Sequence, residues 1–226
     1  MSRAPRVTAF ADAVLARIGF RDNPYFTALA DGSMSLEQFR ASQEQFYFAV
    51  RYFPRPMSAL ISRMPDPAQR IDLLHNIVEE HGDFRPAEFH QNTFRKFLSS
   101  IGGRSPDQAG VAMRPGVHAF NSVLMAACMT DEVPVGVCCL GIIEHAFAGV
   151  SALIGKTVVR RGWVAASDLT HYALHAELDV RHAEEFFVIV ETAWDEPEGQ
   201  AAIRQGLELG AYAFDQLYRS LMLQRD

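Results

Sequence analysis

The segment THYALHAELDVRHAEEFF, residues 170–187, carries two histidines and an aspartate at helical spacing. At about 100° per residue, Asp179 lies about 40° and His182 about 20° from His175, on opposite sides of it. All three side chains therefore project from one narrow stripe of a helix, where two imidazoles and a carboxylate make half of a transition-metal site. An aspartate and two histidines on a solvated helix face would show the same spacing, so the prediction depends on ligands from other helices.

The composition is that of one globular domain. With 226 residues and no linker-like stretch, we expect a single domain over residues 1–226. Hydrophobic residues make up 49% and charged residues 21%, and the net charge of −6 with a pI near 5.7 argues against a nucleic-acid-binding surface. Asp12 interrupts the opening MSRAPRVTAFADAVL, and no apolar run approaches the length of a membrane span, so we expect neither a signal segment nor a membrane helix, and a cytoplasmic location.

Apolar residues recur at three- and four-residue spacing, and alternating, strand-like segments are missing. Proline and glycine punctuate the chain at intervals that suit helices, which predicts an all-α fold. Ser35, three residues before Gln38, and Ser167 with Asp168 are candidate N-terminal caps. We expect helices at residues 6–18, 35–53, 66–82, 86–101, 115–130, 134–156, 167–194 and 198–223, with a short turn at 24–30.

Acidic and imidazole residues upstream of the stripe also lie in apolar surroundings. Glu44 precedes the apolar segment QFYFAV, and Glu144 interrupts CCLGIIEHAFAGV, where an isolated charge is too costly. Glu80 lies near the end of one expected helix, and His90 follows on the next. Together with the stripe these residues give four carboxylates and three imidazoles, which suit two carboxylate-bridged iron or manganese ions better than a structural zinc.

Each of these residues also has an ordinary explanation. A buried glutamate is most often hydrogen-bonded or salt-bridged, and Glu44 could pair with Arg51, two turns later on the same face. His90 alone would be a surface or capping histidine. The set as a whole favours metal binding.

The remaining nearby histidines are expected to face away from the proposed ligands. His81 and His145 each follow a proposed ligand directly and are rotated about 100° from it, and His75 is turned about 140° from the glutamate five residues later. His171, one turn before the stripe, could be a pocket residue or a partner of a ligand, although a satisfied core histidine is the more common case.

The chain resembles the haem-oxygenase-like diiron oxidases and oxygenases, also called iron-containing redox enzymes, in the superfamily of thiaminase II and pyrroloquinoline quinone synthase. The resemblance rests on NIVEEHGDFRPAEFHQNTFRKFL (residues 76–98), on the lone Glu144 and on the spacing of the stripe. It extends from about residue 35 to the end of the chain. SQEQFYFAVRYFP resembles the family's second helix, in which an acidic residue at the position of Glu44 faces the central pocket. The family's spacing to His90 selects Glu80 over Glu79.

The resemblance implies a haem-oxygenase-like bundle of seven to eight helices around a buried pocket, in a protein that is usually a homodimer. Two ferrous ions, or manganese, would react there with O2 as co-substrate. Members decarboxylate or fragment fatty acids and amino acids or N-oxygenate amines, and nothing in the sequence selects among these reactions. The family's ligand positions correspond to Glu44, Glu80, His90, Glu144, His175, Asp179 and His182.

Tyr47, Arg51 and Tyr172 are expected to line the pocket, where an arginine could hold a substrate carboxylate bidentately. The resemblance implies a small amine, amino acid or fatty acid-like substrate, in natural-product metabolism. The composition leads us to expect no nucleic-acid or membrane partner.

Two other functions stay open at this point. A cofactorless or cysteine-dependent enzyme, similar to thiaminase II or the quinone synthase, would need a thiol of low pKa beside a base. The candidates are Cys128, Cys138 and Cys139, whose apolar surroundings and odd number otherwise suit reduced core thiols. A non-catalytic helical protein would use its polar interior only to bind a ligand or partner.

Overall fold

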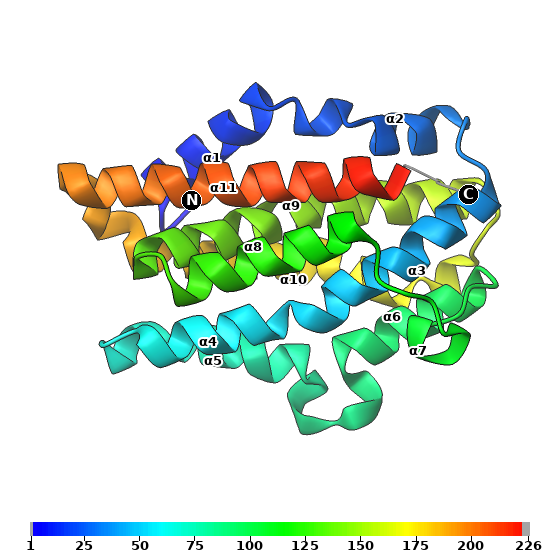
Figure 1. The fold of residues 1–226 in the computed structure, drawn as a ribbon, viewed down its shortest axis with the longest axis horizontal. Coiled ribbons are helices and arrows are strands. Elements are labelled where there is room, and N and C mark those ends of the chain that lie inside the picture. The colour runs from blue at the N-terminus through cyan, green and yellow to red at the C-terminus, as the bar shows by residue number, and fades with distance from the viewer. Residues whose placement is uncertain (1, 223–226) are drawn as a thin grey trace.

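The computed structural model describes residues 2–222, without the side chains of residues 108 and 109. Every regular element in this part of the chain is helical, so the predicted all-α fold is confirmed (Figure 1). Short 3₁₀ turns connect several helices. The α-helices are α1 (Pro5–Arg17), α2 (Pro24–Asp31), α3 (Leu36–Tyr52), α4 (Pro54–Arg63), α5 (Pro67–Glu80), α6 (His90–Ser100), α7 (Pro106–Ala109), α8 (Pro115–Met129), α9 (Val133–Arg160), α10 (Thr170–Glu191) and α11 (Pro197–Met222).

Prolines begin several of these helices rather than separating them. The helix expected at 35–53 is followed at once by α4, which starts at Pro54 and was not predicted. Proline is tolerated in the first turn because the amide proton that it lacks would have no helical partner there. The turn expected at 24–30 is likewise a helix, α2, whose first amides include one bonded by the Asn23 side chain.

The two predicted caps have different outcomes. Ser35 and Gln38 form a capping box: the Ser35 hydroxyl accepts from the Gln38 amide at 3.1 Å, and the Gln38 side chain accepts from the Ser35 amide at 2.8 Å. Asp168 instead ends a 3₁₀ turn, and α10 begins at Thr170 without a side-chain cap. The prediction of a cap at Ser167 and Asp168 is therefore wrong, because this turn precedes the helix.

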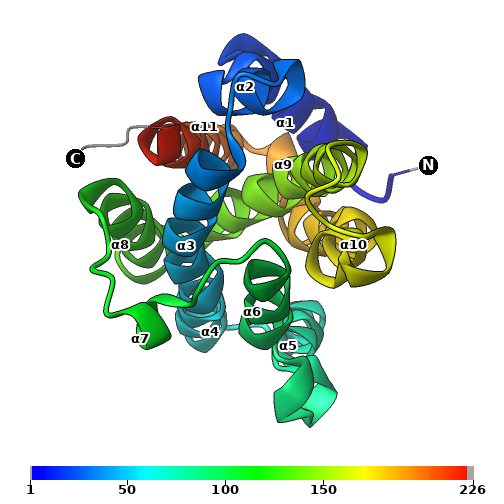
Figure 2. The same ribbon diagram turned by 90° about the vertical axis from the view of Figure 1, so that its right-hand side faces the viewer.

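Helix α9 runs through the interior of the bundle, with α8, α10 and α11 packed along it (Figure 2). Glycines let α11 pack closely against α9, since a Cβ on Gly206 or Gly210 of α11 would collide with backbone oxygens of α9. Contrary to the expectation from the sequence, α9 is long and apolar enough to cross a membrane, by length and composition alone. In the bundle, 78% of the most apolar 18-residue stretch of α9 is buried, and this burial accounts for its apolar composition.

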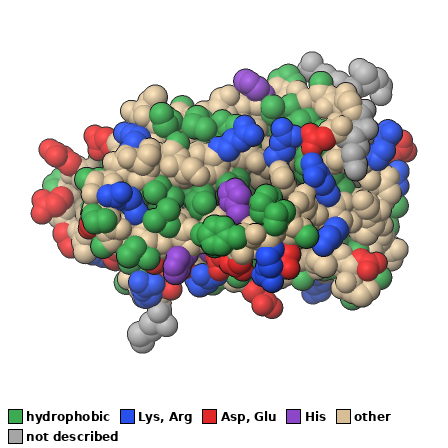
Figure 3. Space-filling view, turned by 90° about the horizontal axis from the view of Figure 1, so that it is seen from below, with side chains coloured by type: hydrophobic (Ala, Val, Ile, Leu, Met, Phe, Trp, Pro, Cys, Tyr) green, Lys and Arg blue, Asp and Glu red, His purple; other side chains and the backbone are tan. Residues whose placement is uncertain are grey.

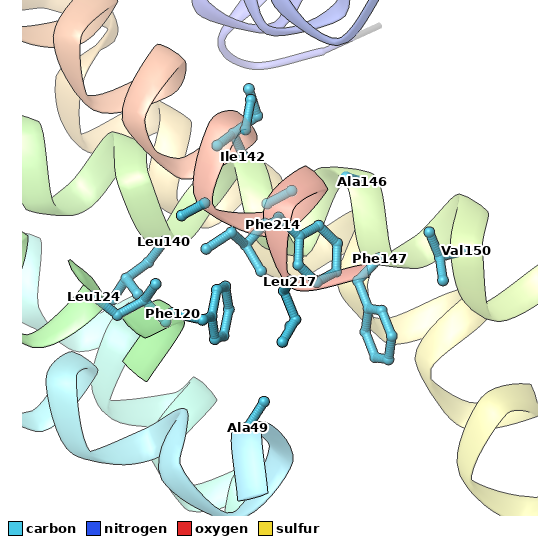
Figure 4. Close-up of a cluster of buried hydrophobic side chains, with 14 of the residues drawn as sticks. Ala49, Phe120, Leu124, Leu140, Ile142, Ala146, Phe147, Val150, Phe214 and Leu217 are labelled. Atoms are coloured by element: carbon cyan, nitrogen blue, oxygen red, sulfur yellow. The ribbon is translucent and has the colours of Figure 1, made fainter. Parts of the chain in front are cut away.

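Aromatic side chains from three helices meet beside α3. Phe120 of α8, Phe147 of α9 and Phe214 of α11 converge on the space next to Ala49 (Figure 4). The ring centroid of Phe214 lies 6.0 Å from that of Phe120 and 6.1 Å from that of Phe147. This aromatic cluster forms one wall of the candidate site.

Candidate metal centre

Six of the seven predicted ligands meet in the interior of the bundle. They come from the end of α5, the start of α6, the middle of α9 and the stripe on α10. Each is buried, with an exposed fraction of 6% or less. The six residues are Glu80, His90, Glu144, His175, Asp179 and His182.

Glu80, His90 and His175 form the first ligand group. His90 Nδ1 lies 2.9 Å from Glu80 Oε1, and the ring centroids of His90 and His175 are 4.6 Å apart. Burial favours a raised pKa for Glu80, but the charge and hydrogen bond of His90 outweigh burial and lower the pKa to about 2. Burial also favours a lowered pKa for His90, and the contact with Glu80 raises this pKa instead. The contact between the two side chains therefore favours the charged form of each.

A left-handed turn brings Glu80 and His90 together. Gly82, Asp83 and Phe84 have φ values of 56°, 50° and 65°, in a region that costs residues other than glycine about 1 kcal/mol or more each. A Cβ on Gly82 would lie 2.5 Å from the backbone carbonyl carbon of Glu88, so the turn has no room for a side chain there. The turn reverses the chain and lets α6 begin at His90.

Glu144, Asp179 and His182 form the second ligand group. Each offers one ligand atom, and these atoms all lie within 4.8 Å of one another. His182 Nδ1 is 3.9 Å from both Glu144 Oε1 and Asp179 Oδ1. Because His175 Nδ1 is also 2.8 Å from Asp179 Oδ1, the two groups are adjacent.

Four atoms of the ligand groups have no hydrogen-bond partner among the described residues: Glu144 Oε1, His175 Nε2, Asp179 Oδ2 and His182 Nδ1. Buried polar atoms are nearly always paired, so four unpaired ones in one place require an explanation. Carboxylate oxygens and imidazole nitrogens are the ligands that iron and manganese accept. The unpaired atoms therefore fit a metal centre of this kind.

The electrostatics of the site also favour a cation. Burial raises the pKa of Glu144 well above its usual value, and the charges of Asp179 and Glu80 raise it further. Burial and the Glu80 charge likewise raise the pKa of Asp179. Carboxyl groups this close keep protons unless a cation replaces them. Burial, helped by the charge of His90, lowers the pKa of His175 to about 3, so this imidazole is neutral and able to act as a ligand.

Glu79, which the family spacing sets aside, contacts the last ligand of the stripe. His182 Nε2 lies 2.6 Å from Glu79 Oε2, and Arg181 Nη2 donates to Glu79 Oε1 at 2.6 Å. An imidazole that donates through Nε2 keeps Nδ1 unprotonated, and Nδ1 is the nitrogen that faces the second ligand group. A carboxylate that orients a ligand histidine in this way is common in metal sites.

An apolar cavity of about 50 Å³ adjoins the site. Glu80, His90, Glu144 and His175 lie in its wall, as does His171. The ligand groups therefore open onto a chamber that is apolar apart from His171. Its apolar lining residues are Phe46, Ala49, Val50, Phe53, Phe120, Ile143, Phe147 and Phe214.

Glu44 does not join the other six predicted ligands. It is half-buried, and its Oε1 accepts a hydrogen bond from the Arg104 amide at 3.0 Å, in the loop after α6. On α3 it lies about 160° around the helix from the cavity-lining Phe46. This placement contradicts the prediction that Glu44 is a ligand. The alternative pairing of Glu44 with Arg51 also fails, because Arg51 binds Asp107.

The three residues expected to line the pocket lie outside it. Tyr47 and Arg51 both donate to Asp107 of α7, at 3.1 and 2.5 Å, and the Tyr172 hydroxyl donates to Gln43. Their polar groups are therefore occupied away from the cavity, and no arginine or lysine is found among the described residues that line it.

The histidines expected to face elsewhere do so. His75 is exposed, and His81 and His145 contact groups outside the site. His171 differs, because it lines the cavity. Its position one turn before the stripe was the only signal of this in the sequence.

The cysteines do not have the properties of nucleophiles. Cys128, Cys138 and Cys139 are free and buried. Burial raises the pKa of all three thiols, that of Cys128 to about 12, whereas a nucleophilic thiol needs a lowered pKa. The expectation of core thiols is confirmed.

Comparisons with known proteins show which proteins the chain resembles. Proteins named 4-aminobenzoate synthase from Chlamydia muridarum and Nitrosomonas europaea are 24% and 21% identical to the chain over 185 and 203 residues. These alignments cover 80% and 85% of this chain and 75% and 81% of the relatives.

Solved structures show the same fold. A CADD-like protein of unknown function from Nostoc punctiforme has a TM-score of 0.79 at 16% identity and covers 96% of each chain. A TenA homologue from Pseudomonas syringae has a TM-score of 0.74 at 16% identity, over 97% of this chain and 92% of its own. A domain from Shewanella denitrificans described as having a haem-oxygenase-like fold has a TM-score of 0.75 at 14% identity, over 96% of this chain and 89% of its own. Since residues 40–215 match the family described as iron-containing redox enzymes, the chain belongs to that family and is an oxidoreductase with a haem-oxygenase-like fold.

Proposed function

We propose that the protein is a non-haem diiron oxidase or oxygenase that uses O2 to oxidise a small amine, amino acid or fatty acid-like molecule. The observation that carries this proposal is the convergence of buried, unpaired carboxylate and imidazole atoms beside an apolar cavity. Three carboxylates and three imidazoles match the mixed oxygen and nitrogen ligation of such centres.

Each of the two ligand groups would hold one of the two ions. Glu80, His90 and His175 would hold one ferrous ion, and the second ligand group would hold the other. When bound, the ions supply the electrons that reduce O2. The carboxylates of the two groups offset most of the positive charge, which a buried site could not otherwise tolerate.

The cavity constrains the substrate. Its aromatic walls exclude water from the ligand groups, which limits side reactions. Because the polar lining atoms belong to the ligand groups and to His171, the polar end of a substrate would face them, with its apolar body against the phenylalanines. A volume of about 50 Å³ is far below the roughly 300 Å³ of a typical ligand pocket, so the aromatic walls must move to admit a substrate. The name 4-aminobenzoate synthase of the relatives favours an aromatic acid or amine as substrate or product.

The proposal includes a small-molecule partner rather than a nucleic acid or a membrane. On the face shown in Figure 3, basic side chains are interspersed with hydrophobic and acidic ones, without the basic stripe that binds nucleic acid. We also propose a homodimer that acts in natural-product metabolism, as the family resemblance implies, and the cytoplasmic location expected from the sequence belongs to the same proposal.

Iron analysis and oxygen uptake test the proposal with two matched variants. Glu144→Gln neutralises a member of the second ligand group, and Glu44→Gln makes the same change outside the site. The parent and Glu44→Gln, loaded with ferrous iron without oxygen, should each bind about two ions per chain and then consume O2. Glu144→Gln should lose at least one ion. Equal iron in the two variants would contradict the site, and a metal-free parent that acts through a cysteine would favour the thiaminase II-like alternative.

A further inference from the structure

Among the described residues that line the cavity, His171 is the one polar side chain outside the six proposed ligands. It is fully buried on α10, and its ring centroid lies 4.3 Å from that of His175. Its Nε2 has no hydrogen-bond partner within residues 2–222 as described. An unpaired buried polar atom is costly, so Nε2 requires a partner that the described part of the chain does not supply.

Thr93 determines which nitrogen of His171 carries the proton. The Thr93 hydroxyl donates to the His90 carbonyl oxygen at 2.9 Å, and the Thr93 hydroxyl oxygen Oγ1 lies 3.1 Å from His171 Nδ1. A hydroxyl has a single proton, so it faces Nδ1 as an acceptor. Nδ1 therefore carries the ring proton, and Nε2 keeps a lone pair.

We propose that His171 Nε2 accepts a hydrogen bond from an N–H or O–H group of the substrate, and so selects substrates that carry such a donor. This inference rests on the proposed function, because the substrate would lie between His171 and the ligand groups. Phe94, with its ring centroid 4.8 Å from that of His171, packs edge-on against the imidazole and offers no competing donor. The substrate donor would thus be the hydrogen-bond partner of the His171 Nε2 lone pair.

The tautomer can be tested without iron or substrate. Long-range ¹H–¹⁵N spectra of histidine-labelled, metal-free protein should show His171 protonated at Nδ1, with the signal assigned by its loss in His171→Leu. Thr93→Ser keeps the hydroxyl and should preserve this pattern, whereas Thr93→Val should shift the ring toward the Nε2-protonated form. A proton on Nε2 in the parent would overturn the proposal, and an unchanged tautomer in Thr93→Val would remove the role of Thr93.

Binding of two probes tests the selection itself. Phenol carries a donor and anisole does not, and calorimetric titrations would compare them on ferrous protein without oxygen and on metal-free protein. One hydrogen bond corresponds to roughly two- to tenfold in affinity. The preference for phenol over anisole should fall by that factor in His171→Leu and be retained in His171→Gln, which keeps an acceptor oxygen.

Three results would overturn the proposal: an unchanged preference in His171→Leu, no binding of phenol to the parent, or loss of iron in His171→Leu, which would make His171 a metal ligand. Failure of the proposed function gives a different result. A parent that binds no iron refutes the diiron proposal, while the probe preference of the metal-free protein still decides the role of His171.

Discussion

Replacing Glu79 with alanine should weaken metal binding without removing a ligand. In the fold, the carboxylate 2.6 Å from His182 Nε2 holds the ring proton on that nitrogen and leaves Nδ1 free toward the second ligand group. Without Glu79 the ring can carry its proton on either nitrogen or rotate, so fewer molecules present the Nδ1 lone pair. Arg181 also loses its acceptor at 2.6 Å and keeps only the longer contact with Glu185 at 3.3 Å, so its positive charge is less well balanced near the site.

The size of the effect follows from the exposure of this contact. Loss of a carboxylate that orients a ligand histidine typically costs 10- to 100-fold in metal affinity, or about 1.4 to 2.7 kcal/mol. The Glu79 side chain is 25% exposed, so water screens the contact in part and the lower half of that range applies. We expect a loss of about tenfold for Glu79→Ala, and a smaller loss for Glu79→Gln because the amide oxygen still accepts a hydrogen bond.

Competition with a fluorescent chelator measures this loss, with Mn²⁺ in air and Fe²⁺ without oxygen. Glu177→Ala is the matched control, because it removes the same charge from an exposed position on α10. Metal affinity of Glu79→Ala within about twofold of this control would refute the claim that Glu79 positions His182.

Three further predictions concern stability, protons and order. Gly82→Ala should lower the free energy of unfolding of the metal-free protein by about 1 to 3 kcal/mol in urea titrations, and more than Gly32→Ala, which shares a positive φ but meets no atom within 4 Å; equal losses would contradict the crowding at Gly82. Metal binding should release protons and tighten as pH rises, because burial raises the pKa of Glu144 and Asp179 and an ion must displace their protons. Calorimetry in buffers of different ionisation enthalpy measures the protons released, and no proton release together with an affinity independent of pH would count against this. Amide exchange over residues 168–185 should slow on iron loading, since α10 carries three of the ligands, and equal exchange with and without iron would argue that the helix does not respond to metal.

Residue spacing predicts which side chains share a face of one helix, but not which way that face points in the fold. His175, Asp179 and His182 share a stripe because helical angles are fixed locally, and the structure confirms that stripe. Glu44 shows where this reasoning stops, because spacing alone does not say which face of α3 turns to the cavity. The chosen face is the one with Phe46, about 160° away, since burying the phenylalanine gains more than burying a carboxylate.

Contacts between helices depend on how the helices dock. Glu79 and His182 are 103 residues apart, and no sequence pattern in either segment predicts their contact. The family spacing favours Glu80 over Glu79, yet both are used, because the neighbouring carboxylates turn to different sides of α5: Glu80 pairs with His90 and Glu79 with His182. Local rules alone likewise miss α4, since Pro54 both ends one predicted helix and begins the next.

Anomalous diffraction at the iron absorption edge tests the central claim most directly, on crystals grown with ferrous iron in the absence of oxygen. We predict two peaks per chain, about 3.5 to 4 Å apart, one beside the first ligand group and one beside the second. A single peak, or peaks away from these six side chains, would contradict a dimetal centre in this bundle.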